Sequence, residues 1–339
     1  MLDNAWQSPV AYDKMPGMLQ IGDQFEHYEI RAHLGQGGMA DIYRAYDIVN
    51  HRDVAIKIPD ATMIGDPAQF ERFRRELEVS KSLHHPAVLC GLDFGQHNRI
   101  PYLVTELVEG KSLRDIIAQS TPMPPEQAVA LVHKIAEGMA YCHQNSVIHR
   151  DLKPENILVT AEGQPVIIDF GLSLTKDSHR ITYGSLSATT GTPDYMAPEQ
   201  VEGKRGDPRT DIYALGTILF ELLSGQTPFS GDNQLAVMAA HLRSSAPRLD
   251  QVQPGVSPQL AAIVAKCLQR DPSERYPSMS ALIDALDHPE TADLAILDRA
   301  QPTSGPGDSG RIVWRALGIS AAVLAVLVIL ALVLQAVHH

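Results

Sequence analysis

The chain has 339 residues, of which 44% are hydrophobic, 20% are charged and 6% are aromatic. This composition is typical of a globular protein and excludes a wholly disordered chain or a low-complexity fibre. Its 40 acidic residues exceed its 28 Lys and Arg residues, and the formal charge of −12 argues against nucleic acid as a partner.

The chain opens with a polar, proline-interrupted stretch, residues 1–27, which lacks the apolar core of a signal peptide and is interpreted as an N-terminal extension. From residue 28 to about residue 58, apolar and polar residues alternate between glycines, which predicts antiparallel β-strands. The glycine-rich run Leu34–Gly38 lies between two of these strands. Glycines allow backbone amides to approach phosphate groups, although a glycine-rich hairpin alone is more often an ordinary turn.

Lys57 follows on an apolar strand, and a buried lysine needs an anionic partner to keep its charge. Residues 69–83 then show the apolar spacing of a helix. Glu76 on this helix fits the inward face better than Glu78, so Glu76 is the favoured partner of Lys57. Surface positions for both charges remain an open alternative. Residues 100–107 return to the pattern of a strand.

The most informative residues are three polar side chains in the middle of the chain. Asp151 and Asn156 lie in the run Val147–Leu158, and Asp169 follows shortly afterwards in an Asp-Phe-Gly sequence. A loop and the β-turn after it can bring these three side chains together. Mg²⁺ prefers oxygen ligands, so Asn156 and Asp169 suit this metal and Asp151 is left to accept a proton from a hydroxyl group.

The segment between Gly171 and Ala197 is rich in Ser and Thr, as is typical of a flexible polar loop. Arg150 directly precedes Asp151, and a cation at that position would suit a phosphate group on this loop. We therefore expect phosphorylation of the loop at one of four candidate sites, with Thr189 and Thr190 favoured over Ser185 and Ser187.

The rest of the globular part is predicted to be largely helical. Apolar periodicity indicates helices at residues 125–144, 211–224, 234–242, 258–269 and 279–286, and short strands at 157–159 and 166–168. A β-rich front and a helical back together predict a two-lobed α+β fold. Residues 288–311 contain many Pro, Gly, Ser and acidic residues and are interpreted as a flexible linker.

The last segment, residues 312–337, is predicted to be a transmembrane helix. Its apolar run of about 22 residues would span ~33 Å, enough to cross the hydrocarbon core of a bilayer. Arg311 and Arg315 lie on its N-terminal side, and no Lys or Arg follows it. The positive-inside rule then predicts a single-pass protein of the inner (plasma) membrane with a cytoplasmic globular domain. Small residues in this helix would permit a homodimer, although it has no GxxxG motif.

Taken together, these motifs resemble those of the protein kinase family over about residues 28–287. The runs Leu-Gly-x-Gly-Gly-Met-Ala and His-Arg-Asp-Leu-Lys-Pro-Glu-Asn are similar to those of bacterial, eukaryotic-like (Hanks-type) serine/threonine kinases. The resemblance implies a bilobal kinase fold with a β-rich N-lobe at residues 28–108 and a helical C-lobe at residues 109–287. It also implies transfer of the γ-phosphoryl group of ATP to Ser and Thr hydroxyl groups of protein substrates, with Mg²⁺ as the metal and Mn²⁺ as an alternative. The phosphorylation expected on the loop would then be autophosphorylation.

The resemblance also implies a role for each residue of the motifs. Lys57 would bind the α- and β-phosphates and pair with Glu76. Asp151 would accept the substrate proton, and Lys153 would steady the γ-phosphate. Asn156 and Asp169 would hold the metal. The glycine-rich turn, the adenine-binding hinge and the apolar residues around the purine would enclose ATP: Leu34, Gly35, Gln36, Gly37, Gly38, Ile42, Ala55, Glu106, Val108 and Leu158.

Three further residues have structural roles by this resemblance. Glu199 and Arg275 would form a buried ion pair in the C-lobe, and Asp211 would anchor the backbone of the catalytic loop. Thr192 resembles a threonine that contacts the catalytic aspartate from the substrate side. Ala40 stands where the family has a third glycine, which predicts a stiffer loop.

Two other functions remain open alternatives. The first is a pseudokinase scaffold that binds nucleotide and partners without turnover. The second is a kinase that acts on small molecules. The Ala-Pro-Glu sequence at residues 197–199 and the long loop before it resemble a platform for protein substrates, and they speak against the second alternative.

Overall fold

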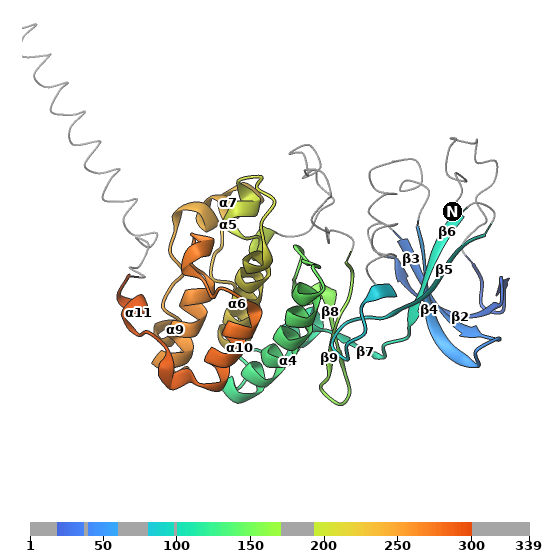
Figure 1. Cartoon of the computed structure of the whole chain (residues 1–339), viewed down its shortest axis with the longest axis horizontal. Helices are drawn as coiled ribbons and strands as arrows, with labels where there is room; N and C mark the ends of the chain where they lie inside the picture. The colour runs from blue at the N-terminus through green and yellow to red at the C-terminus, as the bar shows by residue number, and fades with distance from the viewer. Residues whose placement is uncertain (1–18, 37–39, 60–80, 98–99, 171–192, 300–339) are drawn as a thin grey trace, which may run out of the picture.

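The computed structural model of the chain describes residues 19–36, 40–59, 81–97, 100–170 and 193–299. These residues form two lobes, a β-sheet lobe followed in the chain by a mainly helical lobe (Figure 1). Each lobe has a hydrophobic core of its own. The bilobal fold predicted from the sequence is therefore confirmed.

The N-lobe is a six-stranded antiparallel sheet with the order β1-β2-β3-β4-β6-β5. Its strands are β1 (Gln24–Phe25), β2 (Tyr28–Gln36), β3 (Ala40–Asp47), β4 (Arg52–Pro59), β5 (Gly91–His97) and β6 (Ile100–Glu106). Side chains alternate along β4, so Val54 and Ile56 are buried in the N-lobe core while Ala55 and Lys57 are only partly buried. This alternation places Lys57 on the sheet face opposite to the core.

The sheet begins earlier in the chain than the sequence predicts. Strand β1 lies within the presumed extension, and its residue Phe25 is buried in the N-lobe core. Backbone hydrogen bonds of 2.9 Å, from Gly22 N to Ile30 O and from Ile30 N to Asp23 O, attach this segment to β2. A strand of two residues is too short to show an alternating pattern, so the sequence could not reveal it.

The C-lobe is built around one central helix. Its helices are α3 (Leu113–Ser120), α4 (Pro125–Gln144), α5 (Pro198–Val201), α6 (Pro208–Ser224), α7 (Gln234–Arg243), α8 (Leu249–Val252), α9 (Pro258–Cys267), α10 (Met279–Asp287) and α11 (Ala295–Arg299). Every residue of α6 from Thr210 to Leu223 is buried, since α4, α9 and α10 pack around it (Figure 1). A small sheet of β7 (Gly110–Ser112), β8 (Ile157–Thr160) and β9 (Pro165–Ile167) lies at the junction with the N-lobe.

Helix ends follow local capping signals. The structure gives α4 the bounds predicted from the sequence. Helix α6 begins before residue 211, because the Asp207 side chain accepts a hydrogen bond from the Arg209 backbone and Pro208 occupies the first helical position. Most of the helix predicted at residues 69–83 lies outside the described residues.

Part of the predicted linker is folded. Residues 288–299 contain the short 3₁₀ turn η5 (Pro289–Thr291) and helix α11. Leu297 of α11 is buried in the C-lobe core, and α11 packs against α9. A helix of five residues among Pro and acidic residues has too few turns to show apolar periodicity, so composition alone was misleading here.

The predicted transmembrane helix lies outside the described residues. Within the part of the chain that the structure describes, no helix is both long and apolar enough to cross a membrane. Membrane attachment therefore stays a prediction from the sequence.

His241 of α7 should make the stability of the C-lobe sensitive to acid. Burial lowers the pKa of this imidazole from 6.5 to about 4, so the ring is neutral in the folded protein. In the unfolded chain the ring takes up a proton near pH 6.5. The contribution of His241 to the unfolding free energy is therefore fully present above that pH and is lost as the pH falls toward 4. Between about pH 7 and pH 4 we expect the urea-unfolding free energy of the wild type to fall by about 3 kcal/mol more than that of His241→Gln. Equal pH profiles for the two proteins would contradict this.

Candidate active site

The loop between α4 and β8 is held in place by Asp211, which is buried near the start of α6. Its carboxylate accepts hydrogen bonds from the backbone N of His149 (3.0 Å) and of Arg150 (2.8 Å), and it lies 2.7 Å from Nε2 of His143. Burial alone would raise the pKa of Asp211, but the contact with His143 and the other hydrogen bonds bring it below the ordinary value. The expected anchoring role of Asp211 is confirmed.

This anchor supports an unfavourable backbone conformation. Arg150 has a φ of 63°, in the left-handed region that a residue with a side chain seldom adopts. Such a conformation persists only where surrounding contacts require it, and the bond from Arg150 N to Asp211 is one of them. The residue that follows is Asp151.

Within the loop, two side chains contact Asp151. Lys153 Nζ donates to Asp151 Oδ2 at 2.7 Å. Asn156 Nδ2 donates to the same oxygen at 3.2 Å and to the Asp151 backbone oxygen at 2.8 Å. Because the amide nitrogen of Asn156 is used in this way, its amide oxygen is directed away from Asp151. The loop thus presents a carboxylate and an amide oxygen as two separate acceptors.

Two opposite charges meet between the lobes. Lys57 Nζ on β4 lies 3.7 Å from Oδ1 of Asp169, which follows β9. The backbone N of Ile168 donates to the backbone oxygen of Asn156 at 2.9 Å, so Asp169 and Asn156 are close neighbours. The structure therefore brings four predicted residues to one region: Lys57, Asp151, Asn156 and Asp169.

The oxygen donors of this region fit a magnesium ion. Asn156 offers an amide oxygen and Asp169 a carboxylate, which are hard ligands of the kind that Mg²⁺ prefers. The described ranges contain no group of three or more His, Cys, Asp and Glu residues that could hold a metal ion. A magnesium ion on Asn156 and Asp169 would therefore need phosphate oxygens and water as its remaining ligands.

The residues expected around a nucleotide come from both lobes. Leu34, Gly35 and Gln36 end β2, and the others lie on β3 (Ile42), β4 (Ala55) and β8 (Leu158). Ile42 is paired with Gly35 on one side and with Lys57 on the other. Leu34 is 51% exposed, a large apolar side chain that a bound ligand could cover.

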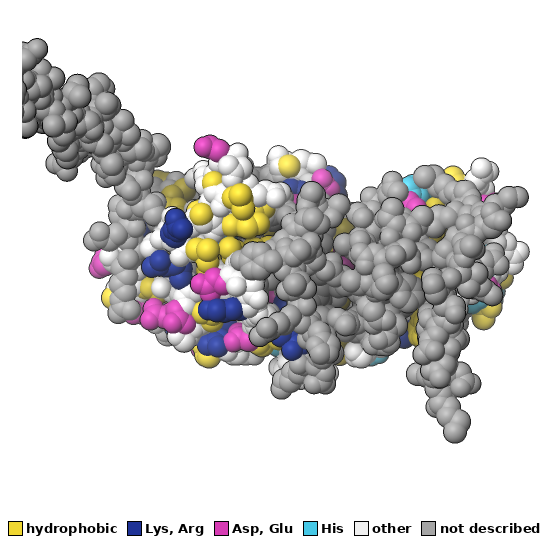
Figure 2. Space-filling view, turned by 90° about the horizontal axis from the view of Figure 1, so that it is seen from above, with side chains coloured by type: hydrophobic (Ala, Val, Ile, Leu, Met, Phe, Trp, Pro, Cys, Tyr) yellow, Lys and Arg dark blue, Asp and Glu magenta, His cyan; other side chains and the backbone are white. Residues whose placement is uncertain are grey.

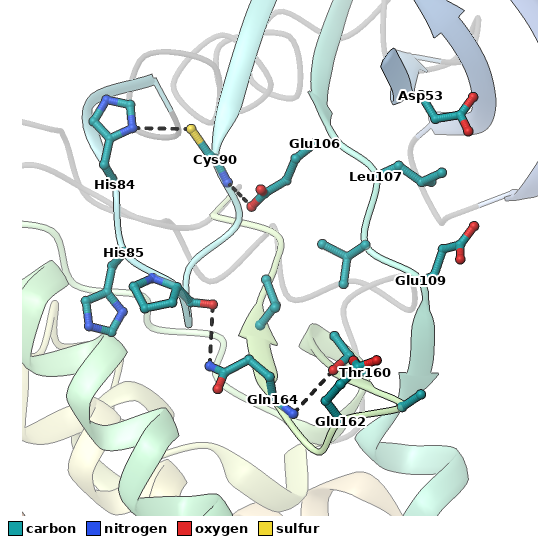
Figure 3. Close-up of a pocket in the computed structure, with 14 residues that line it drawn as sticks. Asp53, His84, His85, Cys90, Glu106, Leu107, Glu109, Thr160, Glu162 and Gln164 are labelled. Atoms are coloured by element: carbon teal, nitrogen blue, oxygen red, sulfur yellow. Dashed lines mark hydrogen bonds between the residues drawn. The ribbon is translucent and has the colours of Figure 1, made fainter.

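The connection between the lobes carries the expected hinge residues Glu106 and Val108. The Glu106 carboxylate accepts a hydrogen bond from Cys90 N at 3.0 Å, and Glu106 N donates to Cys90 O at 3.2 Å. Figure 3 shows the Glu106 side chain turned toward Cys90, in a pocket of about 860 Å³ that His84 and Gln164 also line. Neither Lys57 nor Asp169 lines this pocket, so it is distinct from the site where these two side chains meet. The side chain of Glu106 stiffens the hinge. Its backbone N is already bonded to Cys90, and its backbone oxygen, which accepts a hydrogen bond from Thr105 Oγ1 at 3.1 Å, has one acceptor site left for a nucleotide.

The segment 193–200 is joined to the loop that carries Asp151. Gln200 Nε2 donates to the backbone oxygen of Arg150 at 2.8 Å. Arg114 contacts the hydroxyl of Tyr195 and pairs with Glu155 of the loop at 2.8 Å. The segment is thus attached beside Asp151 at two points.

A buried ion pair fixes this segment to the C-lobe. The guanidinium of Arg275 donates to both carboxylate oxygens of Glu199, at 2.9 and 2.8 Å. Arg275 also donates to three backbone oxygens, and Thr210 donates to Glu199 at 2.8 Å. The ion pair expected from the sequence is therefore confirmed, with its hydrogen-bonding groups well satisfied.

Several predicted residues lie outside the described residues: Gly37, Gly38, Glu76, Thr192 and the candidate phosphorylation sites Thr189, Thr190, Ser185 and Ser187. Arg150, expected to attract a phosphate group, is nearly buried. Burial and the nearby positive charge of Arg205 hold the pKa of Arg150 below its usual value, although Asp211 acts in the opposite direction. Two cations close together would suit a phosphate group.

Sequence reasoning missed three residues that build this region: His143, Gln200 and Arg114. His143 and Asp211 are 68 positions apart, and Gln200 and Arg150 are 50 apart. No local pattern connects residues at such separations, and only an alignment with paired changes could have signalled these contacts.

The chain matches known proteins over most of its length. The sequence pattern of the protein kinase domain family matches residues 28–289. Serine/threonine-protein kinase PknB of Mycobacterium leprae is 37% identical over 286 residues, which cover 83% of this chain and 44% of that protein. Serine/threonine-protein kinase PknL of Mycobacterium bovis is 38% identical over 255 residues, which cover 75% of this chain and 63% of that protein.

A solved structure is also similar. The kinase domain of Mycobacterium tuberculosis PknI, in a crystal structure of a cysteine-to-alanine mutant, matches with a TM-score of 0.63 at 25% identity. The match covers 80% of this chain and 99% of that structure. The curated relatives are longer proteins, and the chain matches about half of their length.

Proposed function

The chain belongs to the protein kinase family, and we propose that it transfers the γ-phosphoryl group of ATP to serine and threonine hydroxyl groups of proteins. The observation that carries this proposal is the meeting of Lys57, Asp151, Asn156 and Asp169 between the two lobes. The relatives PknB and PknL are named serine/threonine-protein kinases, which supports the choice of acceptor. Lys153 lies two residues after Asp151 and donates a hydrogen bond to it. A lysine at this position resembles the motif of serine/threonine-specific enzymes.

The side chains divide the work of the transfer. ATP supplies the phosphoryl group, and magnesium offsets the charge of its phosphates. Asn156 and Asp169 would hold the metal, and Lys57 would bind phosphate oxygens. As the substrate hydroxyl oxygen bonds to phosphorus, Asp151 would accept its proton while Lys153 offsets the negative charge nearby. ADP leaves with the electrons of the broken bond.

Proteins are the proposed substrates, and the surface of the C-lobe supports this. Figure 2 shows Lys and Arg side chains interspersed with Asp and Glu over the described part of this face, next to a group of hydrophobic side chains. Leu235 of α7 is 75% exposed. Exposed apolar side chains favour a protein as the binding partner over a nucleic acid, because a nucleic acid binds best to a continuous basic face.

Anchoring and regulation are also part of the proposal. The apolar run within residues 312–337 and its flanking Arg311 and Arg315 support a single span of the inner membrane with the kinase domain in the cytoplasm. The neighbouring cations Arg150 and Arg205 support autophosphorylation in the loop before residue 193. A homodimer through the membrane helix would bring two such loops together for this reaction.

Transfer should depend strictly on a divalent metal. We expect the purified full chain to place phosphate from ATP on Ser and Thr residues of a peptide library when Mg²⁺ is present. Excess EDTA should reduce incorporation to background, because Asn156 and Asp169 alone cannot offset the phosphate charge. Mass spectrometry of the peptides measures the acceptors. Nucleotide binding without any incorporation would instead establish the pseudokinase alternative.

A further inference from the structure

Arg114 on α3 is the centre of a charged cluster in the C-lobe. Its guanidinium donates from Nε to Glu155 and from Nη1 to Glu221, each at 2.8 Å. Its Nη2 donates to the hydroxyl of Tyr195, which itself donates to Glu221. Glu155 comes from the loop between α4 and β8, Glu221 from α6 and Tyr195 from segment 193–200. All three guanidinium nitrogens thus contact side chains of other elements.

This cluster lies next to the proposed general base. Glu155 directly precedes Asn156 in the chain, and Asn156 Nδ2 donates to Asp151 at 3.2 Å. Tyr195 belongs to segment 193–200, which is joined to the same loop. An extended peptide advances ~3.3 Å per residue, so a substrate with its hydroxyl at Asp151 has flanking residues within reach of the cluster.

The cluster is buried on one side and open on the other. The side chains of Arg114 and Glu155 are 33% and 42% exposed, whereas that of Glu221 is 7% exposed. Both oxygens of Glu221 accept hydrogen bonds, one from Arg114 and the other from Tyr195. The charges that a substrate would meet are therefore the outer carboxylate, Glu155, and the guanidinium beside it.

The arrangement of these charges shows which chemistry this part of the surface recognises. Two carboxylates face one guanidinium, whose planar fork of N–H groups matches carboxylate oxygens well. The guanidinium is supplied by the protein itself, and it offsets the negative charge of Glu155 and Glu221. A second cation is disfavoured here, because Arg114 would repel it.

We propose that Arg114 is a specificity-determining residue, which occupies the carboxylates of Glu155 and Glu221 in place of a basic residue of the protein substrate. The enzyme then accepts substrates that have no Lys or Arg at the corresponding position. The inference rests on the proposed kinase function and extends it to the choice of substrate. Removal of the arginine charge should open an acidic site near Asp151 that selects a basic substrate residue.

Three substitutions of arginines separate this role from a purely structural one. Arg114→Gln removes the charge but keeps an amide that can donate a hydrogen bond, and Arg114→Lys keeps the charge. The matched control is Arg44→Gln on β3. Arg44 also joins two carboxylates, Asp53 at 2.7 Å and Glu109 at 3.0 Å, but these lie outside the cluster of Arg114.

The test measures phosphate transfer by the full chain and its variants to Ser/Thr peptides that carry either a basic or a neutral residue at each flanking position. The readout is the ratio of kcat/KM for the basic peptide to that for the neutral one. We expect Arg114→Gln to raise this ratio about tenfold at one position, as one charge-assisted hydrogen bond would. Arg114→Lys and Arg44→Gln should stay within about threefold of wild type. Partial unfolding would lower both rates alike and leave the ratio unchanged.

Glu155→Gln tests the same charges from the opposite side. Because Glu155 is exposed, this substitution does not disturb the buried Glu221. The single variant should lower the ratio about threefold, since the charge of Arg114 is then less well offset. In combination with Arg114→Gln it should return the ratio to within about threefold of wild type.

The outcomes distinguish this inference from the proposed function. An unchanged ratio in Arg114→Gln or in Glu155→Gln would overturn the role of Arg114 and leave the kinase function intact. An equal rise in Arg44→Gln would also overturn it, because the effect would then not be confined to this cluster. If the wild-type chain transfers phosphate to no peptide, the proposed function is wrong and this inference is wrong with it.

Discussion

The substitution Asp151→Asn is expected to lower phosphate transfer by a factor of about 10²–10⁴. An amide cannot accept the proton of the attacking hydroxyl group, so the general base is lost. The change should leave the local structure intact, because the amide oxygen of asparagine can still accept the hydrogen bond that Lys153 Nζ donates to Asp151 at 2.7 Å. Nucleotide affinity should stay near the wild-type value, since Lys57 and Asp169 remain.

The rate of phosphate incorporation into a Ser/Thr peptide and the binding of a fluorescent ATP analogue measure these two effects. The control is Asp232→Asn, which makes the same chemical change at an exposed position in the loop before α7. The control should transfer phosphate at the wild-type rate. Equal rates for Asp151→Asn and Asp232→Asn would show that Asp151 does not act as the base.

The substitution Glu199→Gln is expected to destabilise the C-lobe by about 3–5 kcal/mol. Arg275 is 2% exposed and Glu199 is 6% exposed, so removal of the carboxylate charge leaves a guanidinium charge in a site with little access to water. The loss should exceed that of a surface pair because water cannot replace the missing charge. For a domain of this size, the midpoint of thermal unfolding should fall by roughly 6–15 °C.

A matched control lies three residues further along the chain. Glu202 pairs with Lys204 at 2.6 Å, but both side chains are exposed, at 46% and 70%. The substitution Glu202→Gln should therefore change the unfolding free energy by less than about 1 kcal/mol. Thermal unfolding followed by circular dichroism measures both variants. Similar shifts in the two midpoints would mean that the Glu199–Arg275 pair contributes no more than a surface contact.

These two expectations concern one connected structure. Arg275 and Tyr213 belong to the buried centre of the C-lobe, and Asp211 on the same helix α6 holds the loop that carries Asp151. Of the residues proposed for chemistry, Lys57, Asp151, Lys153 and Asp169 are at least partly exposed and Asn156 is buried, whereas Asp211, Tyr213 and Arg275, which support them, are all buried. Substitutions of the first kind should reduce rate, and substitutions of the second kind should reduce stability first.

Local sequence was sufficient for features that arise within a few residues. Asp151 contacts Lys153 two positions later and Asn156 five positions later, so one short loop decides how these three side chains meet. Helix α4 was predicted with its correct bounds, because twenty residues give apolar periodicity enough turns to repeat. The apolar-polar alternation of residues 28–58 likewise predicted antiparallel strands, and β2, β3 and β4 lie in this range.

Short elements could not be predicted in this way. Strand β1 has two residues and helix α11 has five, and each is stabilised by one buried side chain, Phe25 or Leu297. Their sequences resemble those of an extension and a linker. Tertiary packing decided that they fold against the two cores.

The amino-acid sequence by itself determined the two-lobed fold and showed which charged and amide residues are candidates for the chemistry. Both depend on periodicity and on motifs that span a few residues. Only the tertiary structure decided how distant residues meet: Lys57 with Asp169, His143 with Asp211, and His241 with Tyr213. The physical reason is that such contacts depend on how buried helices and strands pack against each other. That packing minimises the exposed apolar surface of the whole lobe, and no short stretch of chain encodes it.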